Sequence, residues 1–265
     1  DMFKKTAVVL KDNAGIAIPN SGAQLGNSGP AILEVWFPGQ EDGHIVADVL
    51  FGSVNPSGKT PVTFPIAGKG FLDTIAKDAI HFPGTSAKAN GWVDTTDITV
   101  FPPLVFEDKA LVEYKEGLKI GYRWYDSNAS GKCALRKDLS NPCVAFPFGH
   151  GLSYTEFSVG DASLVYNTSK DTYTVNLPVT NEGNRQGKTV IQVYLGIPAP
   201  KQPPKRLVAF QKVSISSGET VQVTLDIDPS SANHPLGIYD TELKQFKIPS
   251  GSFIVYVGTS SSLRD

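Results

Sequence analysis

The sequence predicts an α/β unit followed by an all-β, immunoglobulin-like sandwich. The first third contains short, continuous apolar runs, which are typical of buried parallel strands. From about residue 158 onward, apolar and polar residues alternate, as they do in half-buried antiparallel strands. At 265 residues, the chain is long enough for two domains that each bury a core.

The first elements of the α/β unit follow from the positions of its apolar runs. A strand is expected over residues 6–10, and a second over residues 31–37, where a Pro-Gly pair ends it. A helix is expected from Glu41 to Phe51, because apolar residues recur there at i and i+4 and acids lie at its start. Gly52 then supplies a C-cap.

Beyond this helix the pattern weakens. A turn at Asn55-Pro-Ser-Gly58 precedes another short strand over residues 61–64. Residues 66–126 contain scattered Gly and Pro and no sustained period, so we expect mostly loop there. The aromatic and charged segment at the end of this region, residues 114–126, is expected to pack across a domain face.

The alternation after residue 158 defines the strands of the sandwich. Every second residue is apolar in four segments, which run from Tyr173 to Val179, Ile191 to Leu195, Val221 to Ile227 and Phe253 to Val257. Turn clusters separate these segments, as expected for an immunoglobulin-like fold of about 100 residues. We therefore divide the chain into residues 1–157, the α/β unit, and residues 158–265, the sandwich.

Composition and charge argue against two classes of partner. The net charge is -2 and 19% of the residues are charged, so nothing favours binding to nucleic acid or to an anionic membrane. No apolar run approaches the ~20 residues needed to cross a bilayer. The chain begins at Asp1 without a signal peptide and soon enters an apolar run, so we interpret it as a piece of a longer protein.

Two cysteines and two sequons indicate a secreted, extracellular protein. Cys133 and Cys143 flank a loop rich in turn residues, so we expect a disulfide; two unpaired thiols in a cytosolic protein are the alternative. Asn128 and Asn167 each begin an N-x-Ser sequon for glycosylation, whereas the proline after Asn55 disqualifies a third.

Most catalytic patterns are missing from the sequence. It has no phosphate loop and no complete dinucleotide fingerprint, and the segment around Ser153 lacks the final Gly of the serine-hydrolase motif. The four histidines have no second His or Cys at metal-ligand spacing, so we expect neither a metal nor a cofactor; they are His44, His81, His150 and His234.

Acids and tryptophans are candidates for sugar chemistry, but sequence alone does not select among them. A glycosidase needs two carboxylates on opposite sides of the sugar, and the acids considered are Glu34, Glu41, Asp42, Glu113, Glu116 and Asp126. The simpler interpretation of each is a cap, an ion pair or a solvated position. Three tryptophans can stack on sugars, although Trp36 in its apolar run is more typical of a core; the others are Trp92 and Trp124.

Three segments resemble, in the same order, the second, α/β sandwich domain of family 3 glycoside hydrolases. The first is Val35-Trp-Phe-Pro-Gly-Gln-Glu-Asp-Gly43 with its continuation to Pro65, and the others are Tyr114 to Asp126 and Phe146-Pro-Phe-Gly-His-Gly-Leu-Ser-Tyr-Thr155. Segments that begin at Val179, Val190 and Pro204 resemble the family's fibronectin type III-like domain. The resemblance covers essentially the whole chain.

The resemblance implies a retaining β-glucosidase that works through a covalent glycosyl-enzyme. In that family the Asp nucleophile lies on an N-terminal (β/α)8 barrel, and the Glu acid/base usually lies upstream of the strand matched by residues 6–10. We therefore assign no catalytic residue here, and we interpret Glu41 as a helix-start residue. The implied substrate is a β-glucoside, such as a cello-oligosaccharide.

The same resemblance implies a partner, the N-terminal barrel portion of the enzyme. We expect the chain to be inactive alone, and we expect an unpaired strand edge and exposed apolar surface to associate tightly with the missing portion. Two other functions stay open. A non-catalytic carbohydrate-binding or scaffolding module would bind glucan without a companion chain, and a stand-alone enzyme would need two acids that face each other across a pocket.

Overall fold

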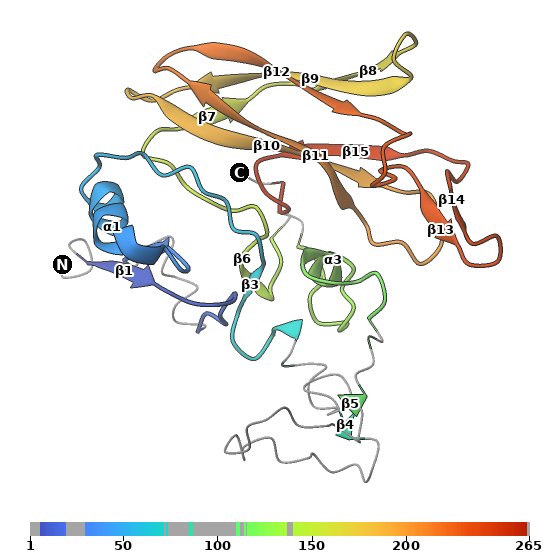
Figure 1. The fold of residues 1–265 in the computed structure, drawn as a ribbon, viewed down its shortest axis with the longest axis horizontal. Coiled ribbons are helices and arrows are strands. Elements are labelled where there is room, and N and C mark those ends of the chain that lie inside the picture. The colour runs from blue at the N-terminus through green and yellow to red at the C-terminus, as the bar shows by residue number, and fades with distance from the viewer. Residues whose placement is uncertain are drawn as a thin grey trace.

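The computed structural model describes residues 6–19, 30–71, 73, 85–86, 110–111, 114, 116–136 and 140–263. In Figure 1 a β-sandwich lies above a smaller portion that contains both helices and strands. The predicted order, an α/β unit followed by a sandwich, is confirmed. Within the described residues, no helix is both long and apolar enough to pass through a lipid bilayer.

The α/β portion begins with a parallel pair of strands. β1 (Ala7–Leu10) pairs with β2 (Ala31–Glu34). β2 ends before the apolar run does, because Trp36 has a φ of 50°, which turns the chain out of the extended conformation. The expected helix is present as a short 3-10 turn, η2 (Gly39–Glu41), and α1 (Asp42–Leu50). Gly52 follows with a φ of 82°, a conformation that favours glycine at a helix end.

The rest of this portion consists, in its described residues, of turns and loops with a few short elements between them. The predicted strand over residues 61–64 is reduced to β3 (Phe64–Pro65), which pairs antiparallel with β6 (Val144–Phe146). Two further short strands, β4 (Thr85–Ser86) and β5 (Ala110–Leu111), pair with each other. The expectation of mostly loop over residues 66–126 did not include α3 (Tyr122–Asp126), which is too short to show a helical period; packing of its aromatic residues holds it in place.

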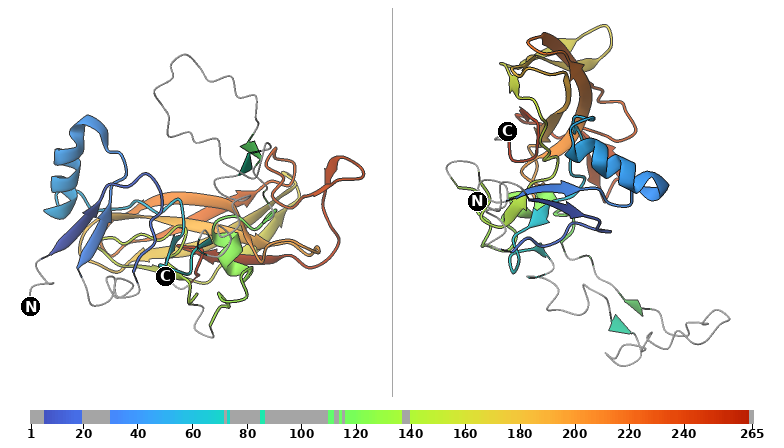
Figure 2. Two further views of the ribbon diagram at one scale, coloured as in Figure 1. Left: turned by 90° about the horizontal axis from the view of Figure 1, so that it is seen from below. Right: turned by 90° about the vertical axis from the view of Figure 1, so that its left-hand side faces the viewer.

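The sandwich consists of two antiparallel sheets. One contains β11 (Arg206–Ile215), β10 (Gly187–Gly196) and β15 (Ile254–Gly258) in that order. The other contains β12 (Thr220–Ile227), β9 (Thr172–Asn181) and β7 (Phe157–Val159), and β8 (Ser163–Asn167) also pairs with β9. A separate hairpin of β13 (Ile238–Asp240) and β14 (Gln245–Lys247) projects from the end of the molecule opposite α1 (Figure 2, left).

The four alternating segments of the sequence form the core of the sandwich. Their inward side chains from β9, β10 and β12 are buried, including Val175, Leu177, Val179, Ile191, Val193, Leu195, Val223, Leu225 and Ile227. Strand β11 had no alternation to predict it, since Leu207, Val208 and Ala209 are all apolar. A β-bulge at Val208 interrupts the alternation, because Ala209 lies opposite Val193 and Leu207 lies opposite Tyr194. Val208 and Ala209 therefore both pack on the core, whereas the backbone N–H of Leu207 bonds to Tyr122 of the α/β portion.

A second, smaller core lies in the α/β portion. Cys133 and Cys143 form a disulfide there, and both are 1% exposed. Trp124 and Tyr125 of α3 pack against them, and Phe71 meets the Trp124 ring edge-on at 5.6 Å. The disulfide expected from the sequence is therefore present, and it fixes the loop that follows α3 to the start of β6.

Candidate functional site

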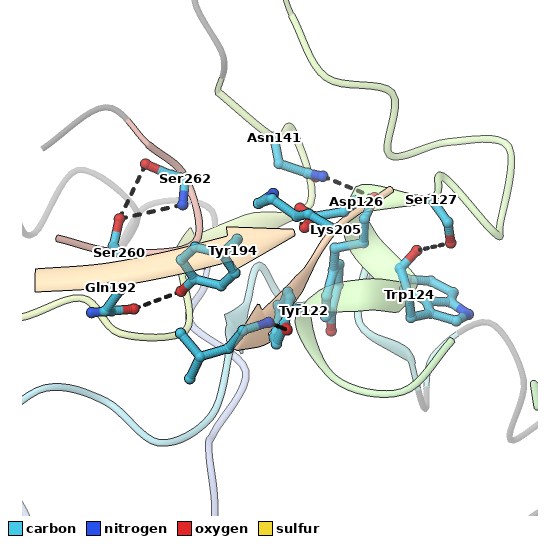
Figure 3. Close-up of polar contacts among 12 residues, drawn as sticks. Tyr122, Trp124, Asp126, Ser127, Asn141, Gln192, Tyr194, Lys205, Ser260 and Ser262 are labelled. Atoms are coloured by element: carbon cyan, nitrogen blue, oxygen red, sulfur yellow. Dashed lines mark hydrogen bonds and ion pairs between the residues drawn. The ribbon is translucent and has the colours of Figure 1, made fainter. Parts of the chain in front are cut away.

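The two portions meet through aromatic side chains on the outer face of β10. The ring of Tyr122, from α3, stacks on Phe148 with centroids 4.9 Å apart and meets Tyr194 of β10 edge-on at 5.7 Å. The Tyr122 hydroxyl also accepts a hydrogen bond of 2.7 Å from the backbone N–H of Leu207 in β11. Figure 3 shows Tyr122 from α3 beside Tyr194 from the sandwich. The segment from residue 114 to 126 thus packs across the domain face at its C-terminal end, as expected.

A buried ion pair adds charge to this contact. Lys205 Nζ lies 2.6 Å from Asp126 Oδ2, and the two side chains are 7% and 9% exposed. Lys205 also lies over the Tyr194 ring, 5.9 Å from its centroid. Burial raises the pKa of the Asp126 carboxyl, and the Lys205 charge opposes that shift. The pair joins the last residue of α3 to the segment that leads into β11.

Gln192 of β10 links two further segments to this strand. Its Nε2 donates to the carbonyls of Thr259 at 2.5 Å and Gly149 at 3.3 Å, and its Oε1 accepts a bond of 2.5 Å from the Tyr194 hydroxyl. Burial raises the pKa of the Tyr194 phenol, which therefore stays protonated and donates. Gly149 has a φ of 80°, and a Cβ there would lie 2.3 Å from Gln192 Oε1, so the close approach requires glycine.

The cluster formed by Tyr122, Asp126, Gln192, Tyr194 and Lys205 has a structural role. Its polar atoms are buried and bonded to one another, and Tyr194 lies wholly within the contact. Buried polar groups that satisfy one another in this way fix a unique packing arrangement. The cluster therefore holds the α/β portion on the sandwich. Sequence reasoning missed it, although the large ring of Tyr194 on the polar side of an alternating strand was a usable signal.

Three of the six candidate acids, Glu34, Asp42 and Asp126, are in structural contacts. Glu34 Oε1 accepts a bond of 2.9 Å from the backbone N–H of Trp36, and Asp42 forms an ion pair with Lys11. Asp126 belongs to the buried pair described above. Glu41 lies at the N-cap of α1 without a side-chain capping bond, and Glu116 lies in a turn. Glu113 is outside the described residues.

Candidate aromatic, histidine and serine side chains also have local partners. Trp124 is buried in the disulfide core, and Trp36 lies 6.0 Å from the Phe64 ring. His150 stacks on Phe146 and His234 on Phe246, whereas Trp92 and His81 lie outside the described residues and His44 is exposed. Ser153 donates to Asn55 Oδ1 at 2.9 Å. In the described part of the chain, no three His, Cys, Asp or Glu side chains are grouped to hold a metal ion.

Three carboxylates lie at the carboxyl end of the parallel pair, where Leu10 is opposite Glu34 and Lys11 pairs with Asp42. Asp12 follows β1, Glu34 ends β2 and Asp42 begins α1. In each of these residues one oxygen is buried and has no hydrogen-bond partner among the described residues: Asp12 Oδ2, Glu34 Oε2 and Asp42 Oδ1. Open α/β sheets bind ligands at the carboxyl ends of their strands, which is where Asp12 and Glu34 lie. These oxygens therefore leave unused hydrogen-bond acceptors at this end of the sheet.

Comparison with known proteins gives the family. The family model for the glycosyl hydrolase family 3 C-terminal domain matches residues 1–154, and the model for the fibronectin type III-like domain matches residues 189–261. A β-glucosidase B from Emericella nidulans is 35% identical over 234 residues, which are 87% of this chain and 24% of that protein. A xylan 1,4-β-xylosidase from Xylanibacter ruminicola is 31% identical over 89% of this chain and 21% of its own length.

A solved structure agrees with these relatives. DesR, a β-glucosidase from Streptomyces venezuelae in complex with D-glucose, superposes with a TM-score of 0.73 at 31% identity, over 97% of this chain and 27% of its own. The chain thus spans about a quarter of the length of the relatives that it matches. It belongs to glycoside hydrolase family 3, of which it carries C-terminal domain sequence followed by a fibronectin type III-like domain.

Proposed function

We propose that this chain is the C-terminal part of a secreted, retaining β-glucosidase that releases terminal β-D-glucosyl residues from cello-oligosaccharides or other β-glucosides. One observation carries the proposal: the chain matches a β-glucosidase over 87% of its own length but over only 24% of that enzyme. About three quarters of the relative's length thus has no counterpart in these residues. We place both catalytic carboxylates in the N-terminal portion that the relatives carry.

The arrangement of the acids supports this division. The candidates Glu34, Asp42 and Asp126 each bond to a neighbouring group of the fold. A retaining glycosidase instead needs two carboxyl groups about 5–5.5 Å apart on either side of an open sugar site. The role of this chain is then to complete the α/β domain and to hold it on the sandwich.

We expect the purified 265-residue chain to release no p-nitrophenol from p-nitrophenyl β-D-glucoside above the rate in buffer. Absorbance at alkaline pH measures the product, and denaturing electrophoresis checks the sample for a companion polypeptide. Because a β-xylosidase is among the relatives, p-nitrophenyl β-D-xyloside is the matched second substrate. Hydrolysis of either substrate by the lone chain would place a catalytic pair within these residues and overturn the division proposed here.

We also propose that Asn167 carries an N-linked glycan in the secreted protein. Asn167 ends β8, and its Oδ1 accepts bonds from the backbone N–H groups of Ser169 and Lys170, so Nδ2 takes no part in closing the turn. Asn128 is the second proposed site, but its Oδ1 is bonded to the N–H of Cys133 beside the disulfide. Asn167 is the more open of the two acceptors, because residues 164–166 and 168–170 around it are exposed, whereas residues 126, 127 and 130 around Asn128 are half-buried.

Asn167→Gln is expected to lower the intact mass of the chain, secreted from a eukaryotic host, by one glycan. Ser169→Ala keeps the asparagine but removes the sequon, so it should cause the same loss. Mass spectrometry before and after enzymatic deglycosylation measures the effect. If both variants have the glycan mass of the wild type, Asn167 is not a site.

A further inference from the structure

One end of the α/β portion exposes apolar side chains that usually pack in a core. Helix α1 has no buried residue, and Ile45 and Leu50 are 40% and 39% exposed. Phe37, before the helix, and Phe51, after it, are 78% and 87% exposed. Figure 2 shows α1 at one end of the molecule, clear of most of the sandwich. We call these four residues the α1 surface.

The parallel pair beside α1 is also incomplete. No residue of β1 or β2 is buried, and each of the two strands pairs only with the other among the described residues. Parallel sheets in soluble proteins are covered on both faces, and two strands alone do not make a stable sheet. A further layer or further strands are therefore needed at this end of the fold.

The unpartnered oxygens of Asp12, Glu34 and Asp42 indicate which polar groups this further layer must contain. A buried polar atom without a partner is destabilising, so such atoms are rare in complete folds. Ionised carboxylates only accept hydrogen bonds. The missing layer must then combine an apolar face for the α1 surface with N–H donors, or with Lys or Arg side chains, for these oxygens.

We propose that the α1 surface and these three carboxylates form the docking surface for the N-terminal portion that the family relatives carry, whether in the same polypeptide or in another. This inference rests on the proposed function. We choose the N-terminal portion as the occupant because about three quarters of the length of the Emericella nidulans relative lies outside the matched region. The C-terminal end of α1 is already attached to the sandwich side, where the Tyr154 hydroxyl donates to Val49 O and Arg185 donates to Gly52 O. These bonds use backbone carbonyls, so the side chains of Ile45, Leu50 and Phe51 stay exposed and can receive the other portion.

Charge makes a second copy of the chain a poorer occupant. In a symmetric dimer the same patch meets itself, so Asp12, Glu34 and Asp42 would face the same three acids of the other copy. Like charges in a partly buried contact repel. Among the described residues beside these acids, Lys11 is already paired with Asp42. A portion with donors or cations opposite these acids avoids the repulsion.

Coexpression of the 265-residue chain with a tagged N-terminal portion tests the proposal. The probe is the segment of the Emericella nidulans β-glucosidase B that precedes its region of similarity, and the amount of chain that copurifies with it is measured. Ile45→Asp and Phe51→Asp are expected to reduce copurification about tenfold or more, since each places a charge in a dry contact. Glu34→Gln removes one acceptor oxygen and is expected to weaken the association less.

Leu243→Asp is the matched control, because Leu243 is 63% exposed on the β13–β14 hairpin, outside the proposed surface. It should copurify like the wild type. All these substitutions lie at exposed positions or keep the side-chain shape, so the lone variants should keep the wild-type unfolding midpoint. The proposal is overturned if Ile45→Asp and Phe51→Asp copurify as well as the wild type, or if the wild type does not copurify at all. It is also overturned if the chain associates with itself and Ile45→Asp abolishes that self-association.

Activity in the same preparations separates this proposal from the proposed function. A complex that forms, depends on Ile45 and does not hydrolyse p-nitrophenyl β-D-glucoside or β-D-xyloside leaves the docking surface standing and contradicts the glycosidase function. A complex that hydrolyses the glucoside equally well with Ile45→Asp, and copurifies equally well, supports the function and contradicts the docking surface.

Discussion

Lys205→Met is expected to lower the free energy of unfolding at pH 7 by about 3–5 kcal/mol, because it leaves the Asp126 carboxylate buried without its cation. The carboxyl is 9% exposed, so water does not replace the lost partner. The contact with the Tyr194 ring is lost as well. Urea unfolding followed by tryptophan fluorescence measures the change, since Trp124 lies in α3 beside the contact.

The loss should depend on pH in a defined direction. Burial already raises the pKa of Asp126 above its unfolded value of 3.8, and without Lys205 to oppose that shift the folded pKa rises further. A group with a raised folded pKa binds its proton more tightly in the folded state, so stability falls as pH rises from the unfolded pKa to the folded one. The deficit of Lys205→Met should therefore be smaller at pH 4 than at pH 7.

Two comparisons make this prediction specific. The double variant Asp126→Leu/Lys205→Met should recover most of the lost stability, since an apolar pair of similar volume often replaces a buried ion pair at little cost. Lys247→Met breaks an ion pair with Asp240 in which Lys247 is 51% exposed, and it should change the unfolding free energy little. If Lys205→Met behaves like Lys247→Met, the buried pair does not hold the two portions together.

Replacing both cysteines by alanine is expected to lower the free energy of unfolding by about 3 kcal/mol, the loop-closure term for a short cross-linked loop. The bond joins residues with a sequence separation of 10, and both side chains are buried against Trp124 and Tyr125. Its loss frees the segment that follows α3, so the near-ultraviolet circular dichroism of these aromatic residues should weaken too. Urea titration of Cys133→Ala/Cys143→Ala against the wild type measures the effect.

Reduction of the wild type supplies the control for the alanine substitutions. The wild-type chain in reductant and the double variant should unfold at nearly the same urea concentration, below that of the oxidised wild type. A double variant as stable as the oxidised chain would mean that the disulfide adds nothing to this small core. A double variant much less stable than the reduced wild type would assign the loss to packing of the two sulfur atoms.

The sequence by itself determined the helices and strands in which apolar residues recur at a regular spacing over several residues. Strands β9, β10, β12 and β15 follow from alternation over several residues, because one face of each packs in a core and the other does not. Helix α1 follows from its i, i+4 spacing and from the glycine after it. The disulfide follows from two cysteines around a turn-rich loop. Each of these signals is local, so neighbouring residues suffice to show it.

The tertiary structure alone decided what joins these elements. Helix α3 is too short for a period, and it exists where Tyr122 and Trp124 find buried partners from elsewhere in the chain. The same holds for the Lys205 and Asp126 pair, whose residues are 79 positions apart in the sequence. Nor did periodicity reveal that α1 has no buried residue, since an amphipathic pattern shows which face is apolar but not what covers it. Burial depends on contacts between distant segments, and it was these contacts that identified both the cluster between the two portions and the uncovered end of the sheet.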